Sequence, residues 1–241
     1  MNLVMDFGNT WQKMAIVDNN NYLEHITKKQ VSIDDIAQWQ QQFNIENAIL
    51  SSVVDVEKTL LEYLQQHFQF IQLDSHTLLP IKNDYQTPQS LGSDRLAVVV
   101  GAKKLFPQEN VLVLQLGTCL TADFIDTEGV YRGGAIAPGM NMRLEAMHAF
   151  SAKLPQVAFR QIDDFVGKTT EESMLSGVYF GMIDQCDGIV DRYKVRYGHL
   201  QVILTGGDAP IMKNAMKNEV MAISDLVLLG LNEILDYYVK N

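Results

Sequence analysis

The sequence predicts a two-domain α/β protein, and three observations lead to that fold class. The chain has 241 residues, a length that fits one large domain or two small ones. Short apolar segments typical of strands alternate with longer segments whose apolar spacing is helical. An apolar strand, a Gly- and Thr-containing turn and a second strand occur at Gly8 and again at Gly117, about 109 residues later. Because internal duplication is a stronger signal than any single element, we expect two similar α/β domains, residues 1–108 and 109–241.

The first predicted domain opens with a meander of three strands, because short apolar runs are separated by the turn at Gly8 and by a polar turn after Val17. Ser32 precedes an amphipathic segment and is an N-cap signal for the next helix. The polar, proline-containing segment 74–90 is expected to be a loop, followed by a buried helix. The predicted strands are 3–6, 11–17, 22–27, 48–54 and 68–73, and the predicted helices are 33–43, 56–67 and 91–106.

The second predicted domain begins with the same arrangement of three strands and continues with helices. Pro138 and Gly139 precede one helix. Thr169 and Thr170 stand at the start of a long helix that ends near Tyr197. The predicted strands are 111–116, 119–125, 130–137, 201–205 and 221–223, and the predicted helices are 138–150, 169–197, a short one after 208, and 226–238.

Composition and charge exclude several classes of protein. The chain has 29 acidic and 19 basic residues, and its formal net charge of −10 argues against a nucleic-acid partner. Cys119 and Cys186 form no CxxC spacing, so a zinc cluster or redox motif is not expected. The N-terminal segment lacks the basic region of a signal peptide, and the apolar stretches are short for a membrane span. We therefore expect a cytoplasmic protein with no membrane partner.

The turn after the first strand predicts a phosphate site. Asp6 ends an apolar strand, and Gly8, Asn9 and Thr10 follow it with exposed backbone N–H groups and a hydroxyl. Such a concave turn binds phosphate, while the strand-end carboxylate can hold a hydrated Mg²⁺ beside it. Lys13 lies on the following strand and is expected to reach the same phosphate. The alternative is an ordinary hairpin turn, because Asn, Asp and Gly are common in turns.

The second half carries a related set of turns. Gly117 and Thr118, with Thr121 behind them, repeat the first turn, and Gly206 and Gly207 follow a later apolar strand. Glycines at strand-to-helix junctions let the backbone approach a base or ribose closely. One hydroxyl- and glycine-containing turn in each domain fits a nucleoside triphosphate bound in a cleft between the domains.

The segment Gly92–Arg95 opens the helix predicted at 91–106. An Asp in the first turn favours the helix dipole, which is a purely structural explanation for Asp94. An Asp–Arg pair also fits a base beside an anion-binding group, because Arg prefers bidentate carboxylate or phosphate partners. A third candidate, Gly167–Thr169, looks like the end of a P-loop. It is rejected because Ile162 stands where that motif needs its first glycine.

Taken together, these motifs resemble the type III pantothenate kinase family over nearly the whole chain. The matching segments, in the family's order, are Asp6-x-Gly8-Asn9-Thr10, Gly92-x-Asp94-Arg95, Gly117-Thr118-x-x-Thr121-x-Asp123, Gly133-Gly134-x-Ile136-x-Pro138-Gly139 and Thr205-Gly206-Gly207. The resemblance implies two ribonuclease H-like domains of the acetate and sugar kinase, heat-shock 70 and actin superfamily. It also implies ATP-dependent phosphorylation of pantothenate to 4′-phosphopantothenate, with Mg²⁺, a monovalent cation such as K⁺ or NH₄⁺, and a homodimer.

The resemblance also implies roles for individual residues. Asp94 would be the general base for the pantothenate hydroxyl, and Arg95 would bind the carboxylate end of that substrate. Asp6 would position Mg²⁺ through water. Further pantothenate contacts would come from Tyr85, Gly92, Ser93 and Thr170; ATP and its phosphates would contact Gly8, Asn9, Thr10, Lys13, Gly117, Thr118, Thr121, Gly206 and Gly207.

One position departs from the family pattern. The second phosphate motif of the family usually begins with Asp, whereas Gln115 stands there in this chain. Gln115 keeps an oxygen ligand for a monovalent cation but lacks the charge, so we expect weaker activation by K⁺ or NH₄⁺.

Two other functions stay open: a kinase of the same superfamily for a sugar or small acid, and a regulatory relative without turnover. The intact Asp6, Asp94 and Arg95 argue against the second.

Overall fold

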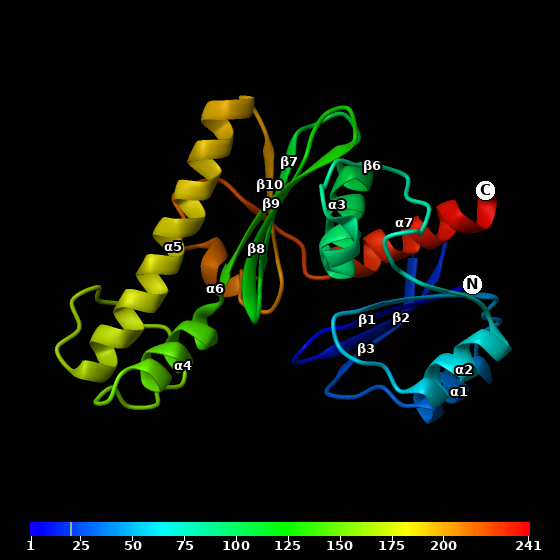
Figure 1. Cartoon of the computed structure of the whole chain (residues 1–241), viewed down its shortest axis with the longest axis horizontal. Coiled ribbons are helices and arrows are strands. Elements are labelled where there is room, and N and C mark those ends of the chain that lie inside the picture. The colour runs from blue at the N-terminus through cyan, green and yellow to red at the C-terminus, as the bar shows by residue number, and fades with distance from the viewer. Residues whose placement is uncertain (20) are drawn as a thin grey trace. The chain divides into compact units, whose positions relative to one another are not determined.

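The computed structural model describes residues 1–19 and 21–241, which form two compact α/β units. Figure 1 shows their helices and strands along the chain. The first unit consists of Met1–Gln108, Glu128–Arg132 and Asp225–Asn241, and the second of Glu109–Thr127 and Gly133–Ser224. The mixed architecture confirms the predicted α/β fold class. None of the helices in the described residues combines the length and apolar character needed to span a bilayer.

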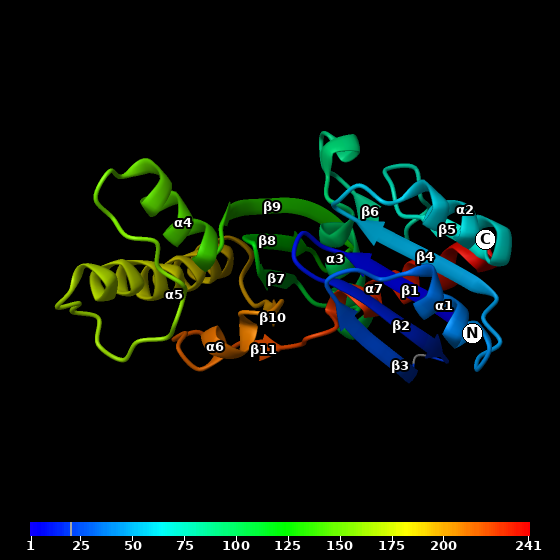
Figure 2. The same cartoon turned by 90° about the horizontal axis from the view of Figure 1, so that it is seen from below.

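The first unit contains a five-stranded sheet in the order β3-β2-β1-β4-β5, which Figure 2 shows from below. Strands β1, β2 and β3 pair antiparallel, so the predicted meander is confirmed; β4 runs parallel to β1 and β5 runs parallel to β4. The bounds are β1 Asn2–Phe7, β2 Gln12–Asp18, β3 Asn21–Lys28, β4 Asn47–Ser52 and β5 Gln69–Gln72.

Helices cover both faces of this sheet. Alternate residues of β1 (Leu3, Met5 and Phe7) pack against α1 and α2 in one apolar core. On the other face Asn2 donates a hydrogen bond to Asn232 of α7 (2.9 Å), and α3 packs beside α7. The period of two along a strand separates these faces. The helix bounds are α1 Ile33–Gln40, α2 Lys58–His67, α3 Ser93–Leu105 and α7 Leu226–Lys240.

Helices α3 and α7 approach each other at two glycines. A Cβ on Gly230 would lie 1.7 Å from the carbonyl oxygen of Ala97, and one on Gly101 would lie 2.6 Å from that of Leu226. The predicted limits placed α7 in the second domain, residues 109–241. In the structure this helix packs within the first unit. The reason is this close backbone contact with α3, a long-range match that the order of elements along the chain does not reveal.

The segment expected to be a loop contains two short elements. Strand β6 (Lys82–Asn83) pairs in parallel with Val130 and Tyr131 at the start of β9 (Val130–Pro138). A 3₁₀ turn, η1 (Pro88–Ser90), follows it. Elements of two or three residues have no readable periodicity, and β6 exists because a partner strand from a distant part of the chain lies beside it.

The second unit repeats the strand arrangement of the first. Its strands follow the order β11-β10-β7-β8-β9. Strand β8 is antiparallel to β7 and β10 is parallel to β7, as β2 and β4 are to β1. The bounds are β7 Val111–Leu116, β8 Cys119–Ile125, β10 Gln201–Thr205 and β11 Met221–Ala222.

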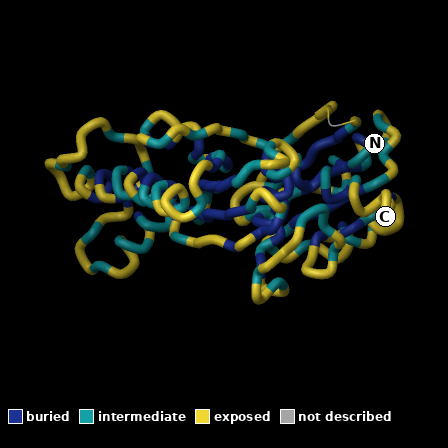
Figure 3. Tube along the Cα trace, turned by 90° about the horizontal axis from the view of Figure 1, so that it is seen from above, coloured by how far each residue is buried: buried dark blue, intermediate teal, exposed yellow. Residues whose placement is uncertain are grey.

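The helices of the second unit pack on one face of its strands. Leu112, Leu114 and Leu116 alternate along β7 and share a core with apolar residues of three helices. Figure 3 shows buried residues following the strands and exposed residues following the outer surfaces of the helices and loops. The helices are α4 Met140–Phe150, α5 Thr170–Tyr197 and α6 Ala209–Lys213.

The close contact between α3 and α7 yields a stability prediction. We expect Gly230→Ala to lower the free energy of unfolding by about 3 kcal/mol, because the new methyl group meets backbone that cannot turn aside. The control is Gly177→Ala on α5, where a Cβ meets nothing within 4 Å. This control should raise stability by about 0.5–1 kcal/mol. Urea unfolding measures both, and equal effects at the two sites would contradict the expectation.

Candidate functional site

A row of three polar side chains crosses the end of the first sheet. Asp6 on β1 is in register with Lys13 on β2 and with Ser51 on β4. Residues paired in register point to the same face of a sheet, so these three side chains lie together. The row carries an acid, a base and a hydroxyl at the carboxyl end of β1, where the Gly8 turn begins.

Two hydroxyl groups link this row to helix α3. Ser51 is fully buried, and its side chain forms a hydrogen bond with Asp6. The Ser51 and Ser93 hydroxyl oxygens lie 3.0 Å apart, and Ser93 also donates to the carbonyl oxygen of Ser52 at 3.3 Å. Asp94 follows Ser93 directly. Ser51 was not among the predicted site residues, although the pair Ser51–Ser52 at the end of an apolar strand is a readable polar signal.

The carboxyl group of Asp6 is strongly perturbed. Burial, followed by the negative charge of Asp94, raises its pKa to about 7, although Lys13 and the Ser51 hydrogen bond act in the opposite direction. Two carboxyl groups near each other in a partly buried place favour a bound cation, because the cation offsets their repulsion. Oxygen ligands of this kind suit Mg²⁺, so the donor set fits that metal.

Asp225 helps to position the Lys13 side chain. The Lys13 Nζ lies 3.6 Å from Asp225 Oδ1, and His25 Nε2 lies 3.9 Å from the same oxygen. Asp225 is the residue before α7. The ammonium group is therefore directed by an acid that is distant in sequence, a contact that no local sequence pattern signals.

The predicted Gly92–Arg95 segment forms the start of α3. The backbone N–H of Arg95 donates to Asp94 Oδ1 at 2.9 Å, and a Cβ on Gly92 would lie 2.6 Å from that same oxygen. Arg95 is only 5% exposed, and its guanidinium carbon lies 5.7 Å from the ring centre of Tyr85. The structure thus brings together four predicted residues of the substrate site: Tyr85, Gly92, Asp94 and Arg95.

The turn between β1 and β2 is tight. The Gly8 N–H donates to the carbonyl oxygen of Trp11 at 3.0 Å, and a Cβ on Gly8 would lie 3.1 Å from that oxygen. Asn9 and Thr10 are exposed at the tip. Polar residues are therefore exposed in the turn that follows Asp6, as the prediction of a phosphate site requires.

In the second unit, the glycine-containing turns meet at the end of β7. The Gly139 N–H donates to the Thr118 carbonyl oxygen at 3.0 Å. Gly206 has φ +91° and a Cβ there would lie 2.2 Å from the Leu116 carbonyl oxygen, so only glycine fits. Gly117, Thr118, Gly206 and Gly207 are consequently grouped within this unit.

Two other predicted residues of this unit lie on neighbouring strands. Gln115 is in register with Thr121 on β8 and with Thr205 on β10, the same place in the second sheet that Asp6 has in the first. The Thr121 hydroxyl donates to Asp123 Oδ2 at 2.8 Å in a buried position. Its hydroxyl hydrogen is therefore directed at that carboxylate.

Thr170 begins α5 on an exposed surface of the second unit. Thr169 is the N-cap, because its hydroxyl accepts from the Glu172 N–H at 3.1 Å, and the Lys168 N–H donates to Glu172 Oε2 at 2.8 Å. The Gly167–Thr169 segment therefore caps a helix, in agreement with its rejection as a P-loop.

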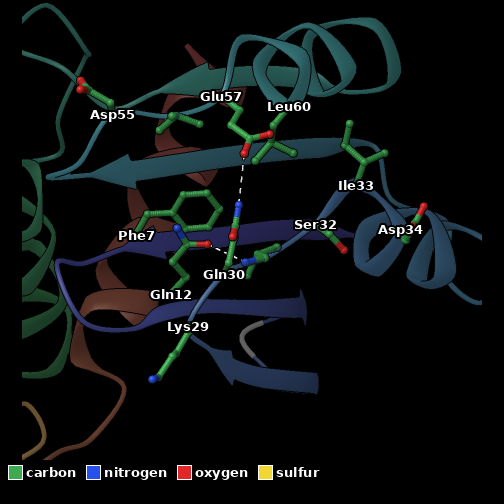
Figure 4. Close-up of a pocket in the computed structure, with 12 residues that line it drawn as sticks. Phe7, Gln12, Lys29, Gln30, Ser32, Ile33, Asp34, Asp55, Glu57 and Leu60 are labelled. Atoms are coloured by element: carbon green, nitrogen blue, oxygen red, sulfur yellow. Dashed lines mark hydrogen bonds between the residues drawn. The ribbon is translucent and has the colours of Figure 1, made fainter.

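A cavity of about 330 Å³ lies elsewhere in the first unit (Figure 4). Phe7 and Gln12 line it on the opposite sheet face from Asp6 and Lys13, and a 3.1 Å hydrogen bond joins Gln30 and Glu57 across it. None of the predicted site residues lines this cavity. Across the described residues, His, Cys, Asp and Glu also form no group of three suited to a metal ion.

Comparison with known families agrees with these motifs. The family model described as type III pantothenate kinase matches residues 2–192. The chain belongs to the type III pantothenate kinase family. A type III pantothenate kinase of Christiangramia forsetii is 39% identical over 239 residues, covering 98% of both chains. Another from Cytophaga hutchinsonii is 39% identical over 241 residues, covering 99% of this chain and 100% of that one.

Solved structures of other proteins resemble this chain in fold. A glucokinase from an Antarctic psychrotroph superposes with a TM-score of 0.53 at 12% identity, covering 98% of each chain. The ethanolamine utilization protein EutJ from Carboxydothermus hydrogenoformans gives 0.55 at 12% identity, covering 96% of this chain and 89% of that one. At such identities the likeness concerns the fold alone.

The raised pKa of Asp6 predicts a pH-dependent stability of the metal-free kinase. Between the unfolded pKa near 3.9 and the folded value of about 7, only the folded state holds the proton. The free energy of unfolding should therefore fall as pH rises from about 4 to 7. Asp6→Asn lacks this fall and should exceed the wild type by roughly 1–3 kcal/mol at pH 8.

Urea unfolding at pH 5, 6, 7 and 8 without metal or nucleotide measures this difference. Asp191→Asn is the control, because a hydrogen bond from Lys217 lowers the pKa of Asp191 and moves its titration below this range. Parallel pH curves for the wild type and Asp6→Asn would contradict the assignment.

Proposed function

We propose that the chain is a cytoplasmic enzyme that transfers a phosphoryl group from ATP to pantothenate, yielding 4′-phosphopantothenate for coenzyme A synthesis. Family membership supports this activity. The observation that carries the assignment of the site is the 3.0 Å contact between Ser51 and Ser93, which joins the strand-end acid Asp6 to the helix start that bears Asp94. The Asp6 end of that link suits phosphate and metal, and the Asp94 end suits an alcohol substrate.

Asp94 acts as the general base that receives the proton of the pantothenate hydroxyl. Arg95 binds the substrate carboxylate, because a guanidinium group offers two parallel N–H donors. Tyr85, Ser93 and Thr170 complete the contacts with pantothenate, and Gly92 leaves room beside the base. Phosphoryl transfer depends mostly on positioning and charge neutralisation, so the alignment of these groups contributes more than the strength of the base.

The phosphates of ATP bind at the turn after β1. Asn9 and Thr10 supply backbone N–H groups and a hydroxyl, and Lys13 supplies a positive charge from the adjacent strand. Gly8 closes the turn through its own N–H and leaves it free of a side chain at that position. In the second unit the nucleotide contacts are Gly117, Thr118, Thr121, Gly206 and Gly207. The close backbone approaches at Gly139 and Gly206 support this assignment, because they leave the turn free of side chains.

Asp6 holds Mg²⁺ through water. The carboxyl pKa of about 7 in the absence of a cation supports this role, since a cation would stabilise the ionised form. When bound, Mg²⁺ neutralises phosphate charge. The protein's own part is to fix the Asp6 carboxylate through the Ser51 hydrogen bond.

The active form is a homodimer with pantothenate bound near the interface between the two copies. Two aromatic side chains on the second unit support a partner surface, because Phe150 is 93% exposed and Phe165 is 71% exposed. Exposed aromatic side chains of this kind are typical of interfaces between proteins.

Asp94→Asn tests the assignment of the base. We expect turnover with pantothenate to fall about 10²- to 10⁴-fold, because the amide cannot accept the proton, while ATP affinity stays within twofold. The control is Asp34→Asn, which also removes an acid from the first turn of a helix, in this case α1. A coupled assay of ATP consumption measures both variants, and turnover of Asp94→Asn within tenfold of wild type would overturn the role of Asp94.

The same assay with a panel of alcohols separates the alternatives. Wild-type consumption of ATP with a sugar or small acid, and none with pantothenate, would indicate another kinase of the superfamily. No turnover with any member of the panel would indicate a regulatory relative.

Gln115 predicts weak activation by a monovalent cation. Its amide oxygen is a neutral ligand, whereas an acid at that place would attract K⁺ or NH₄⁺ more strongly. We expect the wild type to gain less than about threefold in turnover from added K⁺, and Gln115→Asp to gain more. Activity of the wild type that rises steeply from zero with K⁺ would contradict this expectation. Na⁺ at equal ionic strength is the control.

A further inference from the structure

The loop that carries Tyr85 is attached to the start of β9. The Lys82 N–H donates to the Gly129 carbonyl oxygen at 2.9 Å, and the Asp84 N–H donates to the Tyr131 carbonyl oxygen at 3.1 Å. Both bonds belong to the short parallel pairing of β6 with β9. The backbone immediately before Tyr85 is therefore fixed by a strand about 45 residues later in the chain.

Two side-chain contacts reinforce this attachment. Arg132 Nη1 lies 3.0 Å from Asp84 Oδ2, and the Tyr85 N–H donates to Asn83 Oδ1 at 3.0 Å. The ion pair is on the surface, with the Asp84 side chain 63% exposed and that of Arg132 39% exposed. These contacts hold the backbone at and directly before Tyr85.

The Tyr85 ring contacts two further side chains, and these three side chains are called the stack below. The Tyr131 ring is fully buried, and its centre lies 6.1 Å from that of Tyr85 with an angle of 18° between the ring planes. On the Tyr85 ring lies the guanidinium group of Arg95, 5.7 Å from the ring centre. Tyr85 thus contacts both the buried Tyr131 ring and the proposed carboxylate-binding group of Arg95.

We propose that Tyr131 is a positioning residue for Arg95 and acts through Tyr85. Bidentate binding of a carboxylate requires a defined orientation of the guanidinium plane, and a flexible arginine loses conformational entropy when it adopts one. Stacking on an aromatic ring restricts that plane before substrate arrives. Tyr85 belongs to a loop, which alone would leave its ring mobile. The contact with the fully buried Tyr131 ring gives the Tyr85 ring a rigid support. This inference rests on the proposed binding of pantothenate through Arg95.

The decisive measurement separates substrate affinity from ATP affinity. We expect Tyr131→Leu to raise the KM and Kd of pantothenate roughly three- to thirtyfold, with the KM of ATP within twofold. Tyr131→Phe retains the ring and should keep both constants near the wild-type values. A purely structural role would change both KM values or the amount of folded protein. Equal increases in the two KM values, or a Tyr131→Phe enzyme as impaired as Tyr131→Leu, would overturn the proposal.

A surface variant keeps the test independent of the core. Asp84→Ala removes the ion pair with Arg132 without touching a buried residue, and it should raise the Kd of pantothenate severalfold in calorimetry without ATP. Amide hydrogen exchange in residues 84–95 should also become faster in Asp84→Ala than in the wild type, with no substrate present. Unchanged exchange and unchanged Kd would overturn the proposal. A wild-type protein that binds no pantothenate, yet shows faster exchange in Asp84→Ala, would instead overturn the proposed function and leave the stack intact.

Discussion

The hydrogen bond between the buried hydroxyls of Ser51 and Ser93 fixes the start of helix α3 against the end of strand β4. The Asp6 and Asp94 carboxyl groups interact only because this helix begins there. The rest of α3 is held by its contact with α7 at Gly101 and Gly230, where the backbones are too close for any side chain. One polar link thus sets the position of the helix start, and a close apolar contact sets its direction.

Two pairs of charged side chains lie near this helix start, one of like charge and one of opposite charge. Burial and the nearby negative charge of Asp94 together leave the ionised form of Asp6 unfavourable without a cation. Lys13 is the base of the row, and its ammonium group also contacts the Asp225 carboxylate. The first unit therefore holds an acid suited to a metal and a base suited to a phosphate on adjacent strands. Their separation is fixed by sheet register, because a slip of one residue would turn both side chains to the other face.

The sequence predicted the features that depend on local pattern. The strand ends, the Gly8 and Gly117 turns and the cap at Thr169 were all readable, since each depends on residues a few positions apart. Ser51, Asp225 and Tyr131 were not identified, because each acts through a partner more than 40 residues away along the chain. The packing of α7 in the first unit was missed for the same reason. Strand β6 is too short for any periodic signal.

The two sheets share their strand pairing but differ in the polar side chains at the ends of the central strands. The first sheet has Lys13, Asp6 and Ser51 in register, and the second has Thr121, Gln115 and Thr205 in the corresponding places. The strand pairing is kept while both charges are replaced by neutral hydrogen-bonding groups. Backbone register and side-chain chemistry are therefore separable in this fold, since the ladder bonds do not depend on which polar group ends the strand. That separation allows one half to concentrate charge while the other presents a turn of glycines and hydroxyls.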